Sequence, residues 1–246
     1  MFFPFALYQC VRRSGKKNAF TLIEMLTVIS IIGILAAILM PVISNAIGEA
    51  KKLKVSKGLQ QIAMAYASLS LKGFTRELNS CENAAQWAGI FSKYGELNAA
   101  SMFIAGDDYL VETERNPLPK SIGFVKNGTW QMNADFKNFP LSVTVISGIS
   151  SQARAETTPI AYTRGLDNNT GKWRGANGNG GGIYGETGGF IVFLDGHVEF
   201  YSNISDERNM LINYYTGEKT SKISEAVNSG ARALSWTGVE WEAEKK

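Results

Sequence analysis

The sequence is poor in the residues from which most catalytic and zinc sites are built. Its 246 residues include one histidine, His197, and two cysteines, Cys10 and Cys81. Zinc sites draw most of their ligands from His and Cys, so this composition argues against a zinc site. Asp195 precedes His197 by two residues, but the pair straddles a predicted tight turn and no nucleophile motif accompanies it. We therefore expect no catalytic residues and no enzyme activity.

The chain also has little net charge outside its first residues. The net charge is +3, from 25 basic and 22 acidic residues. Residues 1–19 contain Arg12, Arg13, Lys16 and Lys17 and no acid; without these four, 21 basic face 22 acidic residues, a net charge of −1. Nucleic-acid-binding domains carry a clear excess of basic residues. We expect no nucleic acid among the partners of this chain.

One apolar run dominates the N-terminal part of the sequence. About 24 residues from Phe20 to Ile43 are apolar or small, apart from Glu24 and three hydroxyl residues. A membrane span takes about 20 residues, and a buried core helix is usually shorter. A secretory signal peptide has a shorter apolar core and a small-residue cleavage site. We expect a membrane-spanning helix, although basic residues on both flanks leave its orientation open.

Glu24 is the unusual residue of this run. A charged side chain within a bilayer costs about 2.5–3.5 kcal/mol on insertion scales, so such a residue usually has a function. The alternative is that Glu24, near the start of the run, lies at the headgroup boundary, where a charge costs little.

The residues around Glu24 resemble a known processing signal. Lys16 to Glu24, KKNAFTLIE in one-letter code, is similar to the cleavage and methylation motif of type IV prepilins and type II secretion pseudopilins. The resemblance implies that a membrane peptidase cuts between Ala19 and Phe20 on the cytoplasmic side. Phe20 then becomes the N-terminus and is methylated. The family usually has Gly before the cut, where this chain has Ala19.

The resemblance also assigns roles within the helix. In the family, the carboxylate at the position of Glu24 pairs with the N-terminal ammonium of a neighbouring subunit, which sets the register of assembly. Gly33 and Pro41 coincide with positions where family members have a helix-loosening Gly and Pro. Once the leader is removed, Cys81 is the single cysteine, so the mature chain has no internal disulfide.

A domain organisation follows from this resemblance. Residues 1–19 would be a cytoplasmic leader, 20–43 the transmembrane and polymerisation helix, and 44–246 a periplasmic globular domain. The function implied is a structural subunit of a type II secretion pseudopilus or type IV pilus-like filament, held in the inner membrane. The implied partners are copies of the same chain, other pseudopilins, prepilin peptidase, the inner-membrane assembly platform and membrane lipid.

Beyond Pro41 the helical pattern continues. Apolar residues recur at intervals of three or four, which predicts one amphipathic helix with a core-facing stripe. The stripe consists of Ile43, Ile47, Ala50, Leu59, Ile62, Tyr66 and Leu69. Gly73 is the expected end of the helix. Pro41 removes one intrahelical hydrogen bond, which predicts a bend there.

The rest of the chain predicts an α+β fold with a small antiparallel sheet. We expect a helix over Ser80–Tyr94 and strands over Leu141–Ile149 and Thr158–Arg164. Gly165–Gly189 is a long glycine-rich loop without a nucleotide-binding motif. Gly189–Tyr201 is an expected hairpin, because β-rich runs flank Asp195-Gly196.

Less marked patterns complete the prediction. Asp206–Asn213 and Ser221–Leu234 are expected short helices, the second with Ser221 as N-cap. Glu240–Lys246 is expected to be frayed.

The hairpin carries a second resemblance. It is similar to the "DGHV" hairpin near the C-terminal end of many pilin-like proteins with this N-terminus. Verrucomicrobia-type members are also similar at Tyr162–Leu166 and Gly171–Trp173. This resemblance assigns no chemistry.

Three possibilities remain open for the body of the chain. Asp167, Asn169 and Asp195 are hard oxygen donors near flexible glycines and could hold Ca²⁺, as major pseudopilins do in a C-terminal loop. The same residues also suit ordinary turn hydrogen bonding. A different function would be a membrane-anchored binding module that presents the glycine-rich loop to a polysaccharide through Trp173, Tyr184 or Trp130. A third possibility is an envelope enzyme with a membrane anchor.

Overall fold

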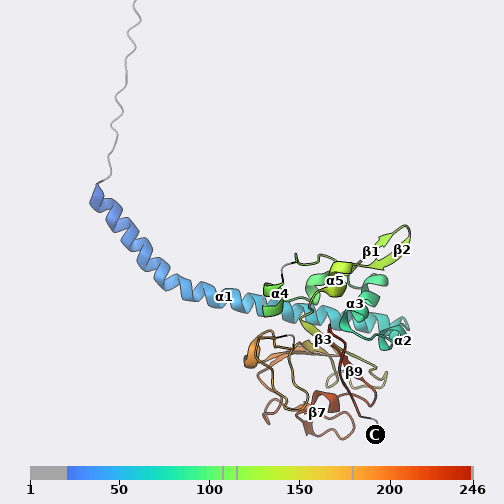
Figure 1. Cartoon of the computed structure of the whole chain (residues 1–246). Helices are drawn as coiled ribbons and strands as arrows, with labels where there is room; N and C mark the ends of the chain where they lie inside the picture. Colours follow the sequence, from blue (N-terminus) through green and yellow to red (C-terminus); the bar gives the residue numbers. More distant parts are fainter. Residues whose placement is uncertain (1–20, 107, 115, 179, 245–246) are drawn as a thin grey trace, which may run out of the picture. The chain divides into compact units, whose positions relative to one another are not determined.

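The computed structural model describes residues 21–106, 108–114, 116–178 and 180–244 (Figure 1). The chain divides into two compact units, residues 1–48 and 49–246. A single helix, α1 (Leu22–Leu71), begins in the first unit and ends in the second. The second unit adds short helices and an antiparallel sheet. The predicted α+β class, a long N-terminal helix followed by a small antiparallel sheet, is therefore confirmed.

The second part of α1 supplies one side of the hydrophobic core. The stripe positions Leu59, Ile62, Tyr66 and Leu69 are buried, as predicted. The three earlier positions, Ile43, Ile47 and Ala50, are exposed, so the core-facing stripe starts later than the periodicity suggests. The buried part of α1 begins at Gly58, where the helix lies close to the backbone of Met102. A Cβ at this position would lie 3.2 Å from the backbone oxygen of Met102.

α1 ends at a glycine, as the sequence predicts. Gly73 has φ = 84°, a left-handed conformation that glycine adopts at little cost. Its N–H donates to the carbonyl of Ser70, and the N–H of Phe74 donates to the carbonyl of Leu69. This pair of hydrogen bonds is a Schellman motif, which satisfies carbonyls at the end of the helix.

Two short helices follow, α2 (Thr75–Asn79) and α3 (Ala84–Lys93). The prediction of one helix from Ser80 is wrong about its start. Asn83 is the N-cap of α3, and its side chain accepts a hydrogen bond from the N–H of Gln86. Trp87 of α3 is fully buried and stacks on Tyr66 of α1, with ring centroids 6.1 Å apart. α3 therefore packs on the second part of α1.

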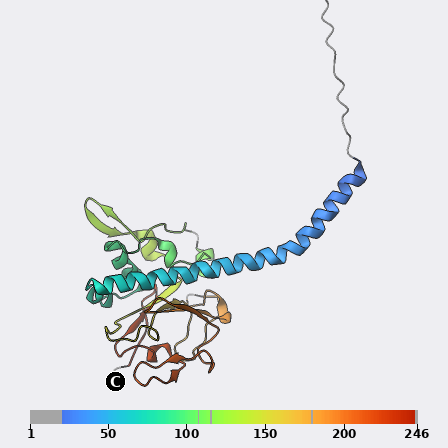
Figure 2. The ribbon, with the colours of Figure 1, turned by 180° about the vertical axis from the view of Figure 1, so that it is seen from behind.

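A segment that the pattern reading left unassigned forms a second small layer. It contains η1 (Ala100–Met102), α4 (Tyr109–Thr113), β1 (Gly123–Lys126), β2 (Thr129–Met132) and α5 (Ala134–Asn138). β1 and β2 pair around Asn127-Gly128, whose φ angles are both positive. An Asn-Gly pair is a strong hairpin signal, so this hairpin was readable from the sequence. In Figures 1 and 2 the hairpin and α5 lie on one side of α1, and the main sheet lies on the other.

The main sheet has six antiparallel strands in the order β10-β9-β3-β4-β5-β6. Its strands are β3 (Val143–Ser147), β4 (Pro159–Thr163), β5 (Gly189–Phe193), β6 (Val198–Tyr201), β9 (Arg232–Leu234) and β10 (Val239–Glu242). Every residue of β3 and β4 is buried, so both faces of the central strands are covered. The predicted strands at Leu141–Ile149 and Thr158–Arg164 and the predicted hairpin are confirmed. Gly165–Gly189 is irregular, apart from bridges at Leu166–Trp173 and Lys172–Asn203 and the turn η2 (Gly185–Thr187).

The C-terminal region corrects three predictions. Asp206–Asn213 is a turn that leads into β7 (Leu211–Ile212), which pairs with β8 (Lys219–Thr220). Ser221–Leu234 contains one turn of 3-10 helix, η3 (Ile223–Glu225), and then strand β9. Turn-forming Asn228-Ser229-Gly230, with Gly230 at φ = 80°, interrupts any helix there.

The expected fraying of Glu240–Lys246 is also wrong for residues 240–243, while residues 245–246 lie outside the described residues. Residues 239–242 form the edge strand β10, and Ala243 is buried. The charged residues at this end give no local strand signal. β10 forms because it pairs with β9 in the sheet.

Candidate functional site

The first candidate site is the beginning of α1. The backbone N–H and the hydroxyl of Thr21 each donate to Oε2 of Glu24 at 2.8 Å. The N–H of Glu24 in turn donates to Oγ1 of Thr21 at 3.3 Å. This reciprocal pattern is a capping box, which satisfies N–H groups at a helix start. The capping role of Thr21 and Glu24 could have been predicted from the spacing Thr-x-x-Glu.

The described part of the first unit, residues 21–48, is an apolar rod formed by the beginning of α1. Its 18-residue window of highest hydropathy has a mean of 2.7, and none of that window is buried. The hydroxyls of Thr27 and Ser30 donate to the carbonyls of Glu24 and Leu26, at 3.0 and 2.7 Å. Each hydroxyl is thus satisfied within the helix, as a lipid-facing position requires. The helix is long and apolar enough to cross a membrane.

The helix positions named from the resemblance lie in this rod. Gly33 has no atoms within 4 Å of where a Cβ would be, so its surface is open. Pro41 lies inside α1, which continues past it. The bend expected at Pro41 stays a prediction. Ala19 and Phe20, the expected cleavage and methylation residues, lie outside the described residues.

The expected calcium ligands belong to two different turns. Oδ1 of Asp167 accepts hydrogen bonds from the N–H groups of Asn169 and Thr170, at 2.9 and 3.1 Å. Its Oδ2 accepts one from Arg174 at 3.1 Å. Partial burial acts in the opposite direction, but these hydrogen bonds hold the pKa of the Asp167 carboxyl below its usual value. Asp195 lies in the turn between β5 and β6.

The only histidine of the sequence is part of that β5–β6 turn. Its Nδ1 lies 2.6 Å from Oδ1 of Asp195, and its ring stacks on Phe193 with centroids 4.2 Å apart. The backbone N–H of His197 also donates to Asp195. These contacts make the pair a turn-stabilising element. In the described part of the chain, no three His, Cys, Asp or Glu side chains group closely enough to hold a metal ion.

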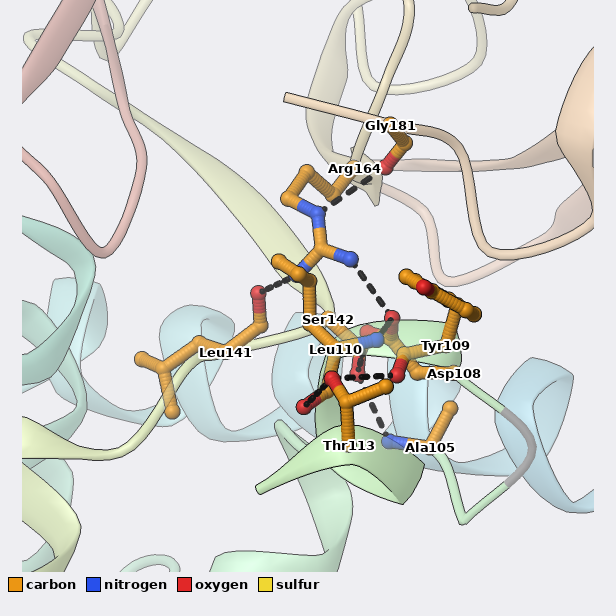
Figure 3. A network of polar contacts seen from close by, with 9 residues as sticks. All are labelled: Ala105, Asp108, Tyr109, Leu110, Thr113, Leu141, Ser142, Arg164 and Gly181. Atoms are coloured by element: carbon orange, nitrogen blue, oxygen red, sulfur yellow. Dashed lines mark hydrogen bonds and ion pairs between the residues drawn. The ribbon is translucent and has the colours of Figure 1, made fainter. Parts of the chain in front are cut away.

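The second unit contains a buried ion pair (Figure 3). Nη2 of Arg164 is 2.6 Å from Oδ1 of Asp108, and both side chains are 1% exposed. The guanidinium also donates to the carbonyls of Leu141 and Gly181, at 2.9 and 3.0 Å. Arg164 therefore connects three segments: the residues before α4, the residues before β3 and the glycine-rich loop.

The carboxylate of this pair is equally well satisfied. Oδ2 of Asp108 accepts a hydrogen bond from the hydroxyl of Ser142 at 2.6 Å, and that hydroxyl accepts one from the N–H of Ala105 at 2.9 Å. The N–H of Leu110 donates to Oδ1 of Asp108. Arg164 lies within Tyr162–Leu166, the segment of the second resemblance. The sequence alone could not assign a role to Arg164, because its partner Asp108 lies 56 residues earlier in the chain.

The three aromatic residues named as alternatives for presenting the glycine-rich loop to a ligand differ in their burial. Trp173 is buried against Gly189, where a Cβ would lie 2.2 Å from its Nε1. Tyr184 is half-buried, with its ring beside those of Phe190 and Phe200. Trp130 is half-buried on β2, with its Nε1 donating to Ser92. Burial makes Trp173 unsuitable for contact with a ligand, whereas the roles expected for Tyr184 and Trp130 stay predictions.

Comparison with known proteins identifies the first of these sites. A family model for the prokaryotic N-terminal methylation motif matches residues 14–40. No curated protein and no solved structure matches the chain significantly. The chain therefore carries the type IV prepilin-like signature at the start of a long apolar helix, and this signature supports a pilin-like or pseudopilin-like membrane-anchored subunit.

Proposed function

We propose that this chain is a structural subunit of a type II secretion pseudopilus or type IV pilus-like filament, assembled through the first part of α1. The observation that carries the proposal is the methylation motif at residues 14–40 joined to an apolar helix with no buried side chains in its most hydrophobic window. An exposed apolar surface of this length needs lipid or other helices around it. The membrane supplies lipid around the helix before assembly, and the filament core supplies neighbouring helices afterwards.

Processing comes first in the proposed sequence of events. Prepilin peptidase cuts between Ala19 and Phe20, and Phe20 is methylated. The subunit is held in the inner membrane, with residues 44–246 on the periplasmic side. The assembly platform then transfers it to the filament, where its partners are further copies or other pseudopilins. The role is structural and needs no cofactor.

Intact-mass measurement of the membrane form tests the processing step. We expect a chain that begins at Phe20 and carries one added methyl group in cells with the peptidase. In cells without the peptidase, the mass of the whole chain is expected. A chain that keeps residues 1–19 when the peptidase is present contradicts the proposal.

Glu24 is proposed to pair with the N-terminal ammonium of a neighbouring subunit. A carboxylate in an apolar filament core is costly alone, and pairing with the ammonium relieves this cost. The capping box complicates a test by Glu24→Ala, because that change also removes a helix cap. Glu24→Gln is sharper, since Gln still accepts the hydrogen bond from Thr21 but carries no charge.

The test compares filament yield in Glu24→Gln with that in Glu24→Ala and in the control Glu49→Gln. Glu49 lies on the same helix and pairs only with Lys52 in the described structure. We expect loss of filaments in both Glu24 variants and normal filaments in the control. Normal assembly of Glu24→Gln would show that Glu24 acts as a cap alone.

A further inference from the structure

The edge strand β10 contains a bulge that redirects a carboxylate. Its pairing with β9 passes from Val239–Leu234 to Trp241–Ala233, which leaves Glu240 as the extra residue. Successive strand residues normally point to opposite faces. Here the hydroxyl of Tyr162 donates a hydrogen bond to Oε2 of Glu240 at 3.1 Å and accepts one from Nε1 of Trp241 at 3.0 Å. The bulge thus places Glu240 and Trp241 on one face.

This arrangement faces a cavity of about 420 Å³. The cavity is bordered by Glu240, Trp236 and Trp241 on the β9–β10 side and by Asp167, Asn169 and Arg174 on the glycine-rich loop. β-bulges are common beside binding sites, where they aim a side chain. A volume of this size is typical of a small-molecule pocket.

The bulged carboxylate is held in place from behind. Tyr162 is fully buried, and Oγ1 of Thr144, also fully buried, lies 3.4 Å from Oε1 of Glu240. Glu240 as a whole residue is exposed, but this carboxylate is turned inward. The loss of solvent around it raises the pKa of Glu240, against the hydrogen bond from Tyr162 and the nearby arginines. The group is a fixed hydrogen-bond acceptor on the cavity wall.

The charges around the cavity favour an uncharged ligand. Arg174 is paired with Asp167, and Arg164 is committed to Asp108. Each guanidinium is therefore balanced by a carboxylate, and the described lining residues include no unpaired cation to attract a phosphate, a sulfate or an acidic sugar. Glu240 forms no ion pair among the described residues and would repel such anions.

We propose that this cavity binds a ring of a neutral oligosaccharide. Glu240 would accept hydrogen bonds from sugar hydroxyls, and the Asn169 amide would both donate and accept. The indole rings of Trp236 and Trp241 offer apolar surface to the C–H face of the sugar. This site differs from the surface expected at Trp173, Tyr184 and Trp130. It also goes beyond the proposed filament role, since it uses only residues of the second unit.

The test is titration of the full chain in lipid nanodiscs free of glycosides. The probes are neutral hexasaccharides of the malto-, cello-, xylo-, manno- and chito- series, with oligogalacturonate and inorganic phosphate for comparison. Binding is measured by calorimetry and by tryptophan fluorescence. The variants are Glu240→Gln, Trp241→Phe and Asn169→Ala. Glu242→Gln on the same strand and Trp130→Phe are the matched controls.

We expect at least one neutral series to bind, with affinity reduced about tenfold or more by Glu240→Gln, as expected when a hydrogen bond to a charged group is lost. The control variants should bind as the unchanged chain does. Asn169 is exposed, so Asn169→Ala keeps the test valid if a strand variant fails to fold. The proposal is overturned if no neutral series binds at millimolar concentration, if only the acidic probes bind, or if binding is the same in all three cavity variants. None of these results depends on filament assembly.

Discussion

At the scale of single residues, the ion pair between Arg164 and Asp108 is the most demanding interaction in the second unit. Removal of one partner from a buried pair leaves an uncompensated charge and costs about 3–5 kcal/mol. We expect Arg164→Ala to lower the free energy of unfolding by about this amount. Urea unfolding followed by tryptophan fluorescence measures it.

Arg174 provides the matched control for that variant. It also pairs with an aspartate, but its side chain is 57% exposed. Exposed pairs contribute about 0–1 kcal/mol. Arg174→Ala should therefore change unfolding by no more than this, and equal losses in the two variants would show that burial of the Arg164 pair has no energetic importance.

Cys81 provides a prediction about pH. Burial raises the pKa of the Cys81 thiol to about 11, although Arg232 opposes the shift. Burial disfavours the charged thiolate, so at pH 8 only about one thiol in a thousand is ionised in the folded chain. A disulfide reagent should react about 100-fold more slowly with native Cys10→Ser protein than with the same protein in denaturant. The folded chain should also lose stability as the pH rises from about 9 through 11. Rapid reaction of the native protein at pH 8 would contradict the assigned burial.

At the scale of elements, the end of α1 depends on the left-handed conformation of Gly73. A residue with a Cβ costs about 1–2 kcal/mol in that conformation. We expect Gly73→Ala to destabilise the second unit by about 1 kcal/mol in urea unfolding. Gly106 is a suitable control, because its φ is not positive and a Cβ there meets nothing within 4 Å. A neutral Gly73→Ala would mean that the helix ends in another way.

The elements that were predicted correctly are those with local signals. The β5–β6 hairpin follows from Asp195-Gly196 between β-rich runs, and the end of α1 follows from Gly73. Strand β10 has no such signal, since the carboxylate of Glu240 depends on Tyr162, 78 residues away. The glycine-rich loop likewise gives no indication that Arg164 reaches Gly181. Contacts between distant residues, rather than local propensity, decide these regions.

The candidate sites also differ in whether local sequence or contacts between distant residues form them. The N-terminal motif is contiguous, so the sequence alone indicated it, and Thr21 with Glu24 could also have been read as a capping box. The cavity beside Glu240 is assembled from the Asp167 turn and the β9–β10 turn, which are far apart in the sequence. Its central carboxylate is aimed by a bulge, and a bulge is visible only when strand register is known.

At the scale of the whole molecule, the metal question can be tested directly. The Asp167 carboxylate is occupied by two backbone N–H groups and Arg174. A calcium ion there would have to displace the guanidinium and take ligands from a turn already satisfied. We propose that no calcium is required, and expect the thermal midpoint to be equal in excess Ca²⁺ and in a chelator. A rise of several degrees with Ca²⁺ would support the alternative of a metal-stabilised loop.

The division into two units predicts that residues 49–246 fold by themselves. The buried residues of α1 all lie between Gly58 and Leu69, and residues 21–46 are exposed. A chain that starts at Glu49 therefore keeps the entire core, and its stability should fall by less than about 1 kcal/mol relative to the full chain in micelles. For a unit of this size that is about 2–4 °C in the thermal midpoint.

The truncated chain should also be monomeric without detergent, as measured by sedimentation, because the apolar rod is gone. A control that starts at Gln61 removes Gly58 and Leu59 from the core, and it should unfold at a clearly lower temperature. If the chain from Glu49 aggregates or lacks near-UV circular dichroism, the first unit is needed for folding and not only for anchoring and assembly.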